Sequence, residues 1–456
     1  MTQSHSLHVS TRGAPVGKID FASRDERFTF EYDPAWRHNL GAYYLSPSIP
    51  LEGPPASGAT IHRFLQNLLP EGRALDIASI YSQVSKDNTF ALIRLLGAEP
   101  VGALSFLAME ASPASAAHIA EKPMHETVRR PITHDELSER IRSRDAIPFP
   151  VWDSKVRLSL AGYQDKLQVL VEGEHLSLAE GTLCSTHLLK PESRNPSMMH
   201  MVANEHFCMR LASALRLPVA PVEIRRIPEP ILLIERFDRK VVWETEARLR
   251  AKAVERLHVI DGCQALDLPS TYKYERNMGG NDAKNIREGV SFERVFSLLD
   301  AMATPATARP FLLRWALLQL LLGNSDAHGK NISFAVDAGG LSPAPMYDLV
   351  SVNAYGENVE SDMAMAYGDA FTIAEIGPYQ LADFAVRTGT PVQQLAREVT
   401  AMSRAVLQHA PALALSEDYV GEERALVKHI AQFVCAQASK LLKIAPEIRK
   451  VDAALL

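Results

Sequence analysis

Gly323-Asn324-Ser325-Asp326-Ala327-His328-Gly329-Lys330-Asn331 is the most informative stretch of this chain. It is polar and follows the most apolar segment, residues 311–322. The apolar segment has hydrophobic side chains on nearly every side, which is typical of a helix buried all round. Gly323 is placed to end that helix, because glycine readily adopts the left-handed conformation found just past helix C-termini. We therefore expect a buried helix whose polar exit loop is held rigidly where it leaves the core.

A hairpin and a second acidic position follow this loop. Residues 332–336 are predicted to form a strand and residues 337–340 a turn, after which a short return segment leads to Tyr347-Asp348-Leu349. This order of elements would bring Asn331 and Asp348, which are 17 positions apart, to the two sides of one bound metal ion.

Asp326, Asn331 and Asp348 form the set of side chains that a phosphoryl-transfer site needs. One carboxylate orients the acceptor hydroxyl and takes its proton, while an asparagine and a second aspartate hold Mg²⁺ against the nucleotide phosphates. Asn and Asp also commonly form turns beside a helix end, and that role would explain Asp326 and Asn331 equally well. The downstream Asp348 favours the phosphoryl-transfer interpretation.

The half of the chain upstream of this loop should supply a phosphate cradle and a lysine. Residues 159–166 lie between two predicted strands, where Gly162 would let the backbone amides approach a phosphate, although an ordinary hairpin turn fits as well. Lys190 ends a strand and matches a lysine that pairs with phosphates, with Glu205 as its possible ion-pair partner; a surface lysine and a solvated glutamate are the alternatives. The strand exit at 232–239 would serve as an adenine-binding hinge between lobes, although any strand exit looks similar.

Composition restricts the class of protein. The chain has 456 residues, 46% of them hydrophobic and 22% charged, which is typical of a globular protein with two or three domains. A net charge of −6 argues against strong unaided binding to nucleic acid or to an anionic membrane. The four cysteines are far apart and form no C-x-x-C pair, which favours a reducing cytosol over a disulfide framework or a zinc site. We expect a cytoplasmic protein without a signal peptide or membrane contact.

The order of predicted elements indicates an α+β protein of the bilobal protein-kinase type, in which a mixed α/β N-terminal lobe precedes an all-α C-terminal lobe. Predicted helices lie at 61–69, 88–96, 133–143 and 199–215. Predicted strands lie at 19–21, 28–32, 155–160, 167–171, 185–189, 222–225 and 231–236. Residues 109–123 are rich in Ala, Ser and Pro and are expected to connect domains. We expect a disordered tail at 1–13, an N-terminal subdomain at 14–150, a nucleotide-binding lobe with the phosphate loop at 151–245 and a helical lobe at 246–456.

Taken together, the motifs resemble the HipA family of bacterial type II toxin–antitoxin serine/threonine kinases. In family order they are Ser159-Leu160-Ala161-Gly162-x-Gln164-x-Lys166, Thr186-His187-Leu188-Leu189-Lys190, Asn204-Glu205, Glu235-Arg236-Phe237-Asp238-Arg239, Cys263-Gln264-Ala265-Leu266, Lys273-Tyr274-Glu275, Asn324-x-Asp326-x-His328-x-Lys330-Asn331 and Tyr347-Asp348. The N-terminal part also resembles the HipA-N region of that family, through residues 64–73, 95–98 and 102–104. The resemblance covers the chain nearly from end to end.

The resemblance implies a role for each matching residue. Asp326 would be the catalytic base, and Asn331 and Asp348 the Mg²⁺ ligands. Ser159 matches a serine whose autophosphorylation expels the phosphate loop and shuts the kinase off. The implied ATP-binding residues are Ser159, Ala161, Gly162, Gln164, Lys190, Glu235, Phe237, Gln264, His328, Asn331, Tyr347 and Asp348. Among these, Lys190 and His328 would contact phosphates, with Lys190 also serving catalysis, and Glu235 and Phe237 would meet the adenine through backbone groups.

The resemblance also implies cofactors and partners. They are ATP with Mg²⁺, a serine of an aminoacyl-tRNA synthetase of the glutamate type as the target, and a HipB-like helix-turn-helix antitoxin that carries the toxin to operator DNA. Two positions depart from the family pattern: Tyr163 stands where a small residue is common, and Ala327 where an arginine is common.

Two other functions remain open from the sequence. A small-molecule kinase of the aminoglycoside or choline type would explain the C-terminal lobe but not the N-terminal region or the Ser159 loop. A kinase-like corepressor with little catalysis would act with a DNA-binding partner. The presence of Lys190, Asp326, Asn331 and Asp348 argues against such a degraded kinase.

Overall fold

A computed structural model describes residues 4–108, 127–153, 155–157, 164–181, 183–276 and 286–456. The chain forms two compact units, each assembled from three separate segments. Unit 1 comprises Met1–Pro191, Arg225–Ile260 and Ala335–Gly340, and unit 2 comprises Glu192–Ile224, Asp261–Phe334 and Leu341–Leu456. The expected boundary at residue 150 does not coincide with this division, because unit 1 continues through that position to Pro191.

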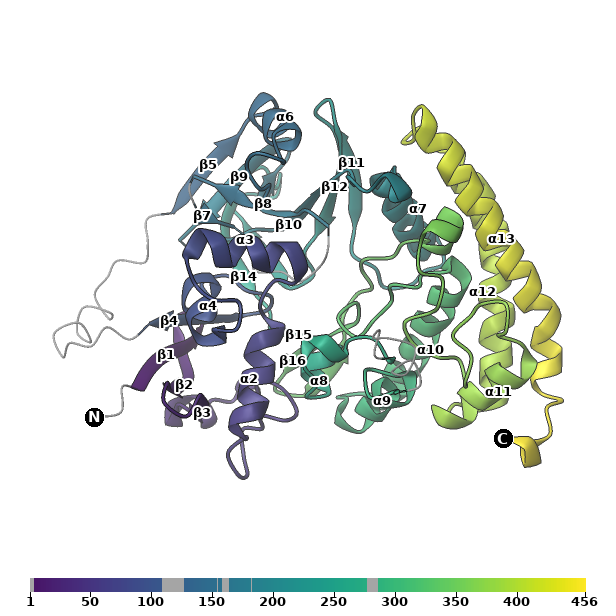
Figure 1. The fold of residues 1–456 in the computed structure, drawn as a ribbon, viewed down its shortest axis with the longest axis horizontal. Helices are drawn as coiled ribbons and strands as arrows, with labels where there is room; N and C mark the ends of the chain where they lie inside the picture. The colour runs from purple at the N-terminus through teal and green to yellow at the C-terminus, as the bar shows by residue number, and fades with distance from the viewer. Residues whose placement is uncertain (1–3, 109–126, 154, 158–163, 182, 277–285) are drawn as a thin grey trace. The chain divides into compact units, whose positions relative to one another are not determined.

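Unit 1 begins with a four-stranded antiparallel sheet and four helices (Figure 1). The sheet has the order β3-β2-β1-β4 and is formed by β1 (Ser4–Thr11), β2 (Ala14–Ala22), β3 (Arg27–Tyr32) and β4 (Leu104–Ala108). The helices are α1 (Pro34–Arg37), α2 (Gly58–Asn67), α3 (Gly72–Ser82) and α4 (Thr89–Leu96). The predicted helices at 61–69 and 88–96 are confirmed as α2 and α4, and Asn88 caps α4 by accepting a hydrogen bond from the Ala91 N–H.

The prediction of a disordered N-terminal tail is wrong for residues 4–11. They form β1, which pairs with both β2 and β4 and therefore lies inside the sheet. Leu7 and Val9 are completely buried, two residues apart on one face of the strand. Polar and histidine neighbours conceal this short alternation in the sequence, and the pairing partner β4 lies almost a hundred residues away.

A second sheet has six strands in the order β11-β12-β10-β8-β9-β5 (Figure 1). It belongs to unit 1 except for the start of β11, because residues 222–224 are part of unit 2. Its strands are β5 (Val128–Ile132), β8 (Leu167–Glu172), β9 (His175–Glu180), β10 (His187–Pro191), β11 (Val222–Arg226) and β12 (Pro230–Glu235). α6 (His134–Arg142) supplies Leu137 and Ile141 to the core of this sheet. β8, β10, β11 and β12 confirm four predicted strands, whereas β5 and β9 were not predicted. The predicted strand at 155–160 is limited to β7 (Lys155–Val156), which pairs with β6 (Val151–Trp152), and residues 158–160 lie outside the described residues.

Strands continue beyond the expected lobe boundary at residue 245. β13 (Arg239–Trp243) and β14 (Ala251–Arg256) form an antiparallel pair, so that boundary falls in the connection between two paired strands. The chain then passes between the units within β15 (Val259–Asp261), β16 (Ser333–Asp337) and β17 (Gly340–Pro343). β16 and β17 confirm the strand and turn predicted after the polar loop.

Unit 2 is mainly helical and is built around α10 (Pro305–Leu322). α10 packs against α9 (Phe292–Ser297), α12 (Val392–Leu413) and α13 (Glu422–Ile448) (Figure 1). The remaining helices are α7 (Met201–Ala214), which confirms the prediction at 199–215, α8 (Gly262–Ala265) and α11 (Pro378–Arg387). Short 3-10 turns lie at Pro196–Met198, Ser270–Tyr272, Leu298–Ala301, Asn353–Asn358 and Ala453–Leu455. Among the described residues, no helix is long and apolar enough to cross a membrane.

Candidate active site

The polar loop of unit 2 begins where α10 ends, as predicted. Gly323 has φ of 62°, and a Cβ atom there would lie 2.6 Å from the ring of Phe433, so both the backbone conformation and the available space require glycine. The next residue, Asn324, is turned back onto the helix: its N–H donates to the Gln319 carbonyl at 3.0 Å, and its side-chain amide donates to Gln319 Oε1 at 2.9 Å. The buried helix therefore fixes the direction in which the loop leaves the core.

Asp326 presents its carboxylate from a loop that is otherwise buried. Its side chain is 49% exposed, whereas every other residue between 323 and 331 is buried. A rigid, buried backbone that carries a single accessible carboxylate is the arrangement that an enzyme needs to hold a base against an incoming hydroxyl group.

Asn331 is oriented by the backbone of Asp326. Its side-chain Nδ2 donates to the Asp326 carbonyl at 2.8 Å, and the His328 N–H donates to the same carbonyl at 2.8 Å. With the amide nitrogen engaged in this way, the ligand that Asn331 can offer to a metal is its Oδ1 oxygen. Amide and carboxylate oxygens suit Mg²⁺, which takes few protein ligands and completes its shell with water and phosphate oxygens. Asn331 and Asp348 carry oxygen atoms of the kind that Mg²⁺ prefers, and their role as its ligands stays a prediction. The described residues contain no group of three or more His, Cys, Asp or Glu side chains that would hold a metal by themselves.

Asp348 lies in a segment that is hydrogen-bonded to the polar loop. The hydroxyl of the preceding Tyr347 donates to the Lys330 carbonyl at 2.6 Å and lies 2.7 Å from Ser333 Oγ. Burial raises the pKa of Tyr347, so this phenol remains a protonated donor. Asp348 itself has φ of 55°, a left-handed conformation that is uncommon for a residue other than glycine. Tyr347 thus ties the backbone beside Asp348 to the backbone beside Asn331.

α8 carries the predicted Gln264 and packs closely against the same loop. Gln264 forms a capping box with Asp261: its N–H donates to Asp261 Oδ1 at 2.8 Å, and its Oε1 accepts from the Asp261 N–H at 3.1 Å. Lys330 forms a hydrogen-bonded ion pair with Asp261. A Cβ atom on Gly262 would lie 2.6 Å from the Gly329 carbonyl oxygen, so two glycines allow the helix and the loop to approach each other.

The other predicted site residues belong to unit 1. Lys190 on β10 is paired with Leu232 of β12 and is buried, which rules out the surface-lysine alternative. Gln164 Nε2 donates to the Pro191 carbonyl at 3.3 Å, next to Lys190 in the chain. Glu235 ends β12 and is exposed, and Phe237 follows it and is half-buried.

Three predicted phosphate-loop residues, Ser159, Ala161 and Gly162, lie outside the described residues. Glu205, the expected partner of Lys190, belongs to α7 in unit 2 and is 1% exposed, so it is not a solvated helix glutamate. Unit 2 therefore carries Gln264, Asp326, His328, Asn331, Tyr347 and Asp348, and unit 1 carries Gln164, Lys190, Glu235 and Phe237.

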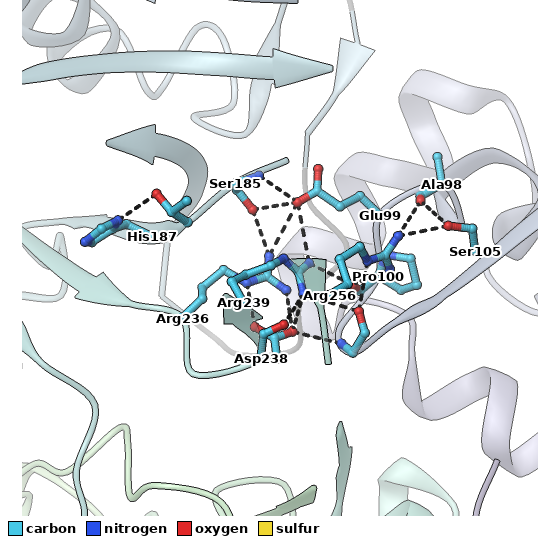
Figure 2. A network of polar contacts seen from close by, with 12 residues as sticks. Ala98, Glu99, Pro100, Ser105, Ser185, His187, Arg236, Asp238, Arg239 and Arg256 are labelled. Atoms are coloured by element: carbon cyan, nitrogen blue, oxygen red, sulfur yellow. Dashed lines mark hydrogen bonds and ion pairs between the residues drawn. The ribbon is translucent and has the colours of Figure 1, made fainter. Parts of the chain in front are cut away.

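A buried charge network holds the chain on both sides of Phe237 (Figure 2). Asp238 accepts hydrogen bonds from Arg236 Nε at 2.9 Å and Nη2 at 2.8 Å, from Arg239 Nη1 at 2.7 Å and from the Gly102 N–H at 2.9 Å. Burial alone would raise the pKa of Asp238, but the two guanidinium groups outweigh burial and hold that pKa well below its usual range. The donor from Gly102 links this motif to the N-terminal part of the chain.

Two more groups extend this network to residues 98–105 (Figure 2). Glu99 Oε1 accepts from Ser185 Oγ at 2.6 Å and lies 3.8 Å from Arg236 Nη1. Arg256 donates to the Gly102 carbonyl at 3.0 Å and to the Ala98 carbonyl at 3.1 Å. Burial, together with the neighbouring Arg239, lowers the pKa of Arg256 to about 10. The motif at 235–239 is visible in the sequence, but its partners more than 130 positions earlier are not.

The sequence motifs assign no role to Tyr274, yet its side chain contacts the predicted base. Its hydroxyl donates a hydrogen bond to Asp326 Oδ1, across 52 positions of the chain. Its ring also meets the His328 ring edge-on, with centroids 4.9 Å apart and an interplanar angle of 88°. Lys273-Tyr274-Glu275 was recognised as a motif, but spacing alone does not show that Tyr274 reaches the predicted base.

Comparison with known proteins matches both the N-terminal and the C-terminal part of the chain to domains of one family. The family model of the HipA-like C-terminal domain matches residues 158–410, and that of the HipA N-terminal domain matches residues 7–107. The serine/threonine-protein kinase toxin HipA of Shewanella oneidensis is 40% identical over 440 residues, which is 96% of each chain. A putative kinase of Sinorhizobium fredii, Y4mE, is 33% identical over 96% of this chain and 98% of its own.

A solved structure extends the likeness to the fold. HipA from the complex of Shewanella oneidensis HipA, HipB and operator DNA superposes with a TM-score of 0.86, at 38% identity, over 98% of this chain and 100% of its own. The predicted α+β, kinase-like fold is confirmed by this match together with the mixed unit 1 and the mainly helical unit 2. The chain therefore belongs to the HipA family of serine/threonine-protein kinase toxins.

Proposed function

We propose that this protein transfers the γ-phosphoryl group of ATP, bound with Mg²⁺, to the hydroxyl of a serine in a protein target. The observation that carries the proposal is the half-exposed carboxylate of Asp326 on an otherwise buried loop, with Asn331 oriented by the Asp326 carbonyl. In the proposed reaction, Asp326 receives the proton of the serine hydroxyl while the serine oxygen bonds to the γ-phosphorus. The bond from that phosphorus to the bridging oxygen breaks, and ADP leaves.

The remaining proposed roles follow from charge and from the available atoms. Asn331 Oδ1 and the Asp348 carboxylate would hold Mg²⁺, which would neutralise charge on the phosphate oxygens. Lys190 and His328 contact phosphates. His328 Nδ1 accepts from the Lys330 N–H at 3.3 Å, so in a neutral imidazole the proton lies on Nε2, which can donate to an oxygen.

Further residues are proposed to contact the nucleotide. We propose that the loop containing Ser159, Ala161, Gly162 and Gln164 cradles the phosphates, and that the backbone of Glu235 and Phe237 meets the adenine. Gln264 and Tyr347 are the remaining proposed nucleotide-binding residues. Hydrogen bonds to Ser333 and to the Lys330 carbonyl hold the Tyr347 side chain in place.

The proposed target is an aminoacyl-tRNA synthetase of the glutamate type, whose phosphorylation would block tRNA charging and stop growth. Phosphorylation of Ser159 by the kinase itself would end its activity. A HipB-like antitoxin would bind the toxin and supply most of the contact with operator DNA. The matched structure is a complex of HipA, HipB and operator DNA, and the net charge of −6 suits a subunit that leaves the DNA contacts to its partner.

A second candidate function is a corepressor that binds an antitoxin on DNA with little catalysis. The same matched complex favours it, since HipA is present there together with operator DNA. Lys190, Asp326, Asn331 and Asp348 are nevertheless all retained in this chain. Selection for a scaffold alone gives no reason to keep these four groups.

The proposal is tested by incubating the purified protein, alone and with glutamate–tRNA ligase, with Mg·ATP, and by mapping phosphate with intact and peptide mass spectrometry. We expect phosphate on Ser159 and on a serine of the ligase, and none with the Asp326→Ala variant. Full incorporation by Asp326→Ala would refute the role of Asp326. If the parent protein binds ATP but modifies neither itself nor the ligase, the corepressor function is favoured instead.

A further inference from the structure

The side chain of Tyr274 lies against both functional groups of the polar loop. Its hydroxyl donates to Asp326 Oδ1, and its ring packs edge-on against His328. His328 Nε2 lies 3.9 Å from the same Asp326 oxygen. One aromatic side chain therefore contacts the predicted base and the predicted phosphate ligand, both of which belong to unit 2, as Tyr274 does.

The backbone around Tyr274 is fixed on several sides. The carbonyl of Lys273 accepts from the Gly329 N–H at 2.8 Å, which links this segment to the polar loop. A Cβ atom on Gly289 would lie 1.7 Å from the Tyr274 carbonyl oxygen, so the chain at Gly289 runs directly against it. These contacts fix the backbone that carries the Tyr274 side chain.

The next residue, Glu275, anchors the segment from inside the core. It is 1% exposed, its carboxylate accepts from the Ala366 N–H at 2.8 Å, and it forms an ion pair with Arg287. Its own N–H donates to the Ala364 carbonyl at 3.0 Å. A buried, paired carboxylate directly after Tyr274 holds the backbone of that tyrosine in place.

We propose that Tyr274 is a positioning residue that orients the carboxylate of Asp326 for the proposed phosphoryl transfer. This inference rests on the proposed role of Asp326 as the base. A hydrogen bond to Oδ1 fixes the rotation of the carboxylate plane and so sets the direction in which Oδ2 meets the serine hydroxyl. A phenol keeps its proton at neutral pH and carries no charge, so it orients the carboxylate without adding a cation that would compete with Mg²⁺.

The test compares Tyr274→Phe with Tyr272→Phe in the full-length protein. Tyr274→Phe removes only the oxygen and keeps the ring beside His328. Tyr272→Phe is the matched control, because the Tyr272 hydroxyl lies 3.5 Å from Glu288 and does not meet Asp326. For each variant we would measure kcat and the KM for ATP in phosphorylation of glutamate–tRNA ligase and of the protein itself, the affinity for Mg·ATP by calorimetry, and the melting temperature.

We expect kcat of Tyr274→Phe to fall by about tenfold or more, the effect of losing one hydrogen bond to a charged group that orients a base. The KM for ATP, the calorimetric affinity and the melting temperature should stay at the parental values, and Tyr272→Phe should behave as the parent. An unchanged or increased kcat in Tyr274→Phe would overturn the inference. So would a loss of kcat accompanied by weaker ATP binding or by a lower melting temperature, because that pattern indicates a merely structural role.

Asp326→Ala separates the two levels of the proposal. If Asp326→Ala is inactive and Tyr274→Phe is fully active, only the positioning role fails. If Asp326→Ala remains active, or if the parent protein transfers no phosphate, the proposed function fails, and the role of Tyr274 fails with it.

Discussion

Replacing Asp238 by asparagine should remove the central charge of the buried network in unit 1 (Figure 2). The carboxylate of Asp238 accepts four hydrogen bonds, three of them from the guanidinium groups of Arg236 and Arg239. Asparagine has the same shape but only one acceptor oxygen, so at least one buried donor loses its partner. Both arginines also lose the negative charge that offsets their burial.

The expected cost is about 4 kcal/mol, because removing one partner of a buried ion pair typically costs 3–5 kcal/mol. This corresponds to roughly a thousandfold change in the folding equilibrium of the affected region. The measurement is urea denaturation of the full-length protein, with hydrogen exchange of peptides from β10 and β12 to localise the loss.

The matched control is Glu255→Gln, which removes a carboxylate that pairs with Arg12 at 3.5 Å on the surface of the same unit. The side chains of this pair are 55% and 37% exposed, so we expect a change below about 0.5 kcal/mol. A loss below about 1 kcal/mol for Asp238→Asn, or one equal to that of the control, would refute the reasoning. Either result would mean that the arginines find other compensation for their charge.

Two further predictions concern close packing and pH. Gly329→Ala should lower the free energy of unfolding by about 1–3 kcal/mol, because the new Cβ atom would lie 2.5 Å from Val290 Cγ2. It should also slow phosphoryl transfer, because Gly329 lies in the polar loop. A melting temperature and an activity equal to those of the parent would contradict this prediction. Burial lowers the pKa of His258 to about 4, while Nε2 bonds the Leu45 carbonyl, so the folded state favours the neutral ring. In the unfolded chain the His258 ring binds a proton near pH 6.5, so stability present above that pH should be lost as the pH falls towards 4. The expected loss at pH 5 is about 2 kcal/mol. Denaturation midpoints measured from pH 7 to pH 5 should fall less steeply in His258→Gln than in the parent, and equal slopes would contradict the prediction.

The polar loop and its helix could be predicted because their signals are local. An apolar run ended by glycine defines α10, and the spacing of Asp326, Asn331 and Asp348 matches the set of side chains proposed for phosphoryl transfer. The strands that escaped prediction depend on distant partners. β1 shows its alternation over only a few residues and becomes a strand because β2 and β4 pair with both of its edges.

The supporting contacts of the site could not be predicted for the same reason. Tyr274 reaches Asp326 across 52 positions, and Asp238 meets Gly102 across 136. A sequence motif identifies each partner as notable, but only the folded chain shows that the two meet. The burial of the polar loop is equally hidden in the sequence, because the residues that pack against it, such as Phe433 beside Gly323 and Val290 beside Gly329, are remote in the chain.

The division of each unit into three segments has a consequence for synthesis. Unit 1 receives its last segment, Ala335–Gly340, only after α10 and the polar loop of unit 2 have been translated in full. Because the segments of the two units alternate along the chain, part of each unit is synthesised before the other unit is complete. Cleavage of the chain at any single position therefore yields neither unit intact and separate from the other. A ribosome that stalls before residue 340 releases a fragment lacking part of unit 1, Asp348 and everything after it. The order of the segments along the chain thus delays assembly of the complete set of proposed site residues until late in translation.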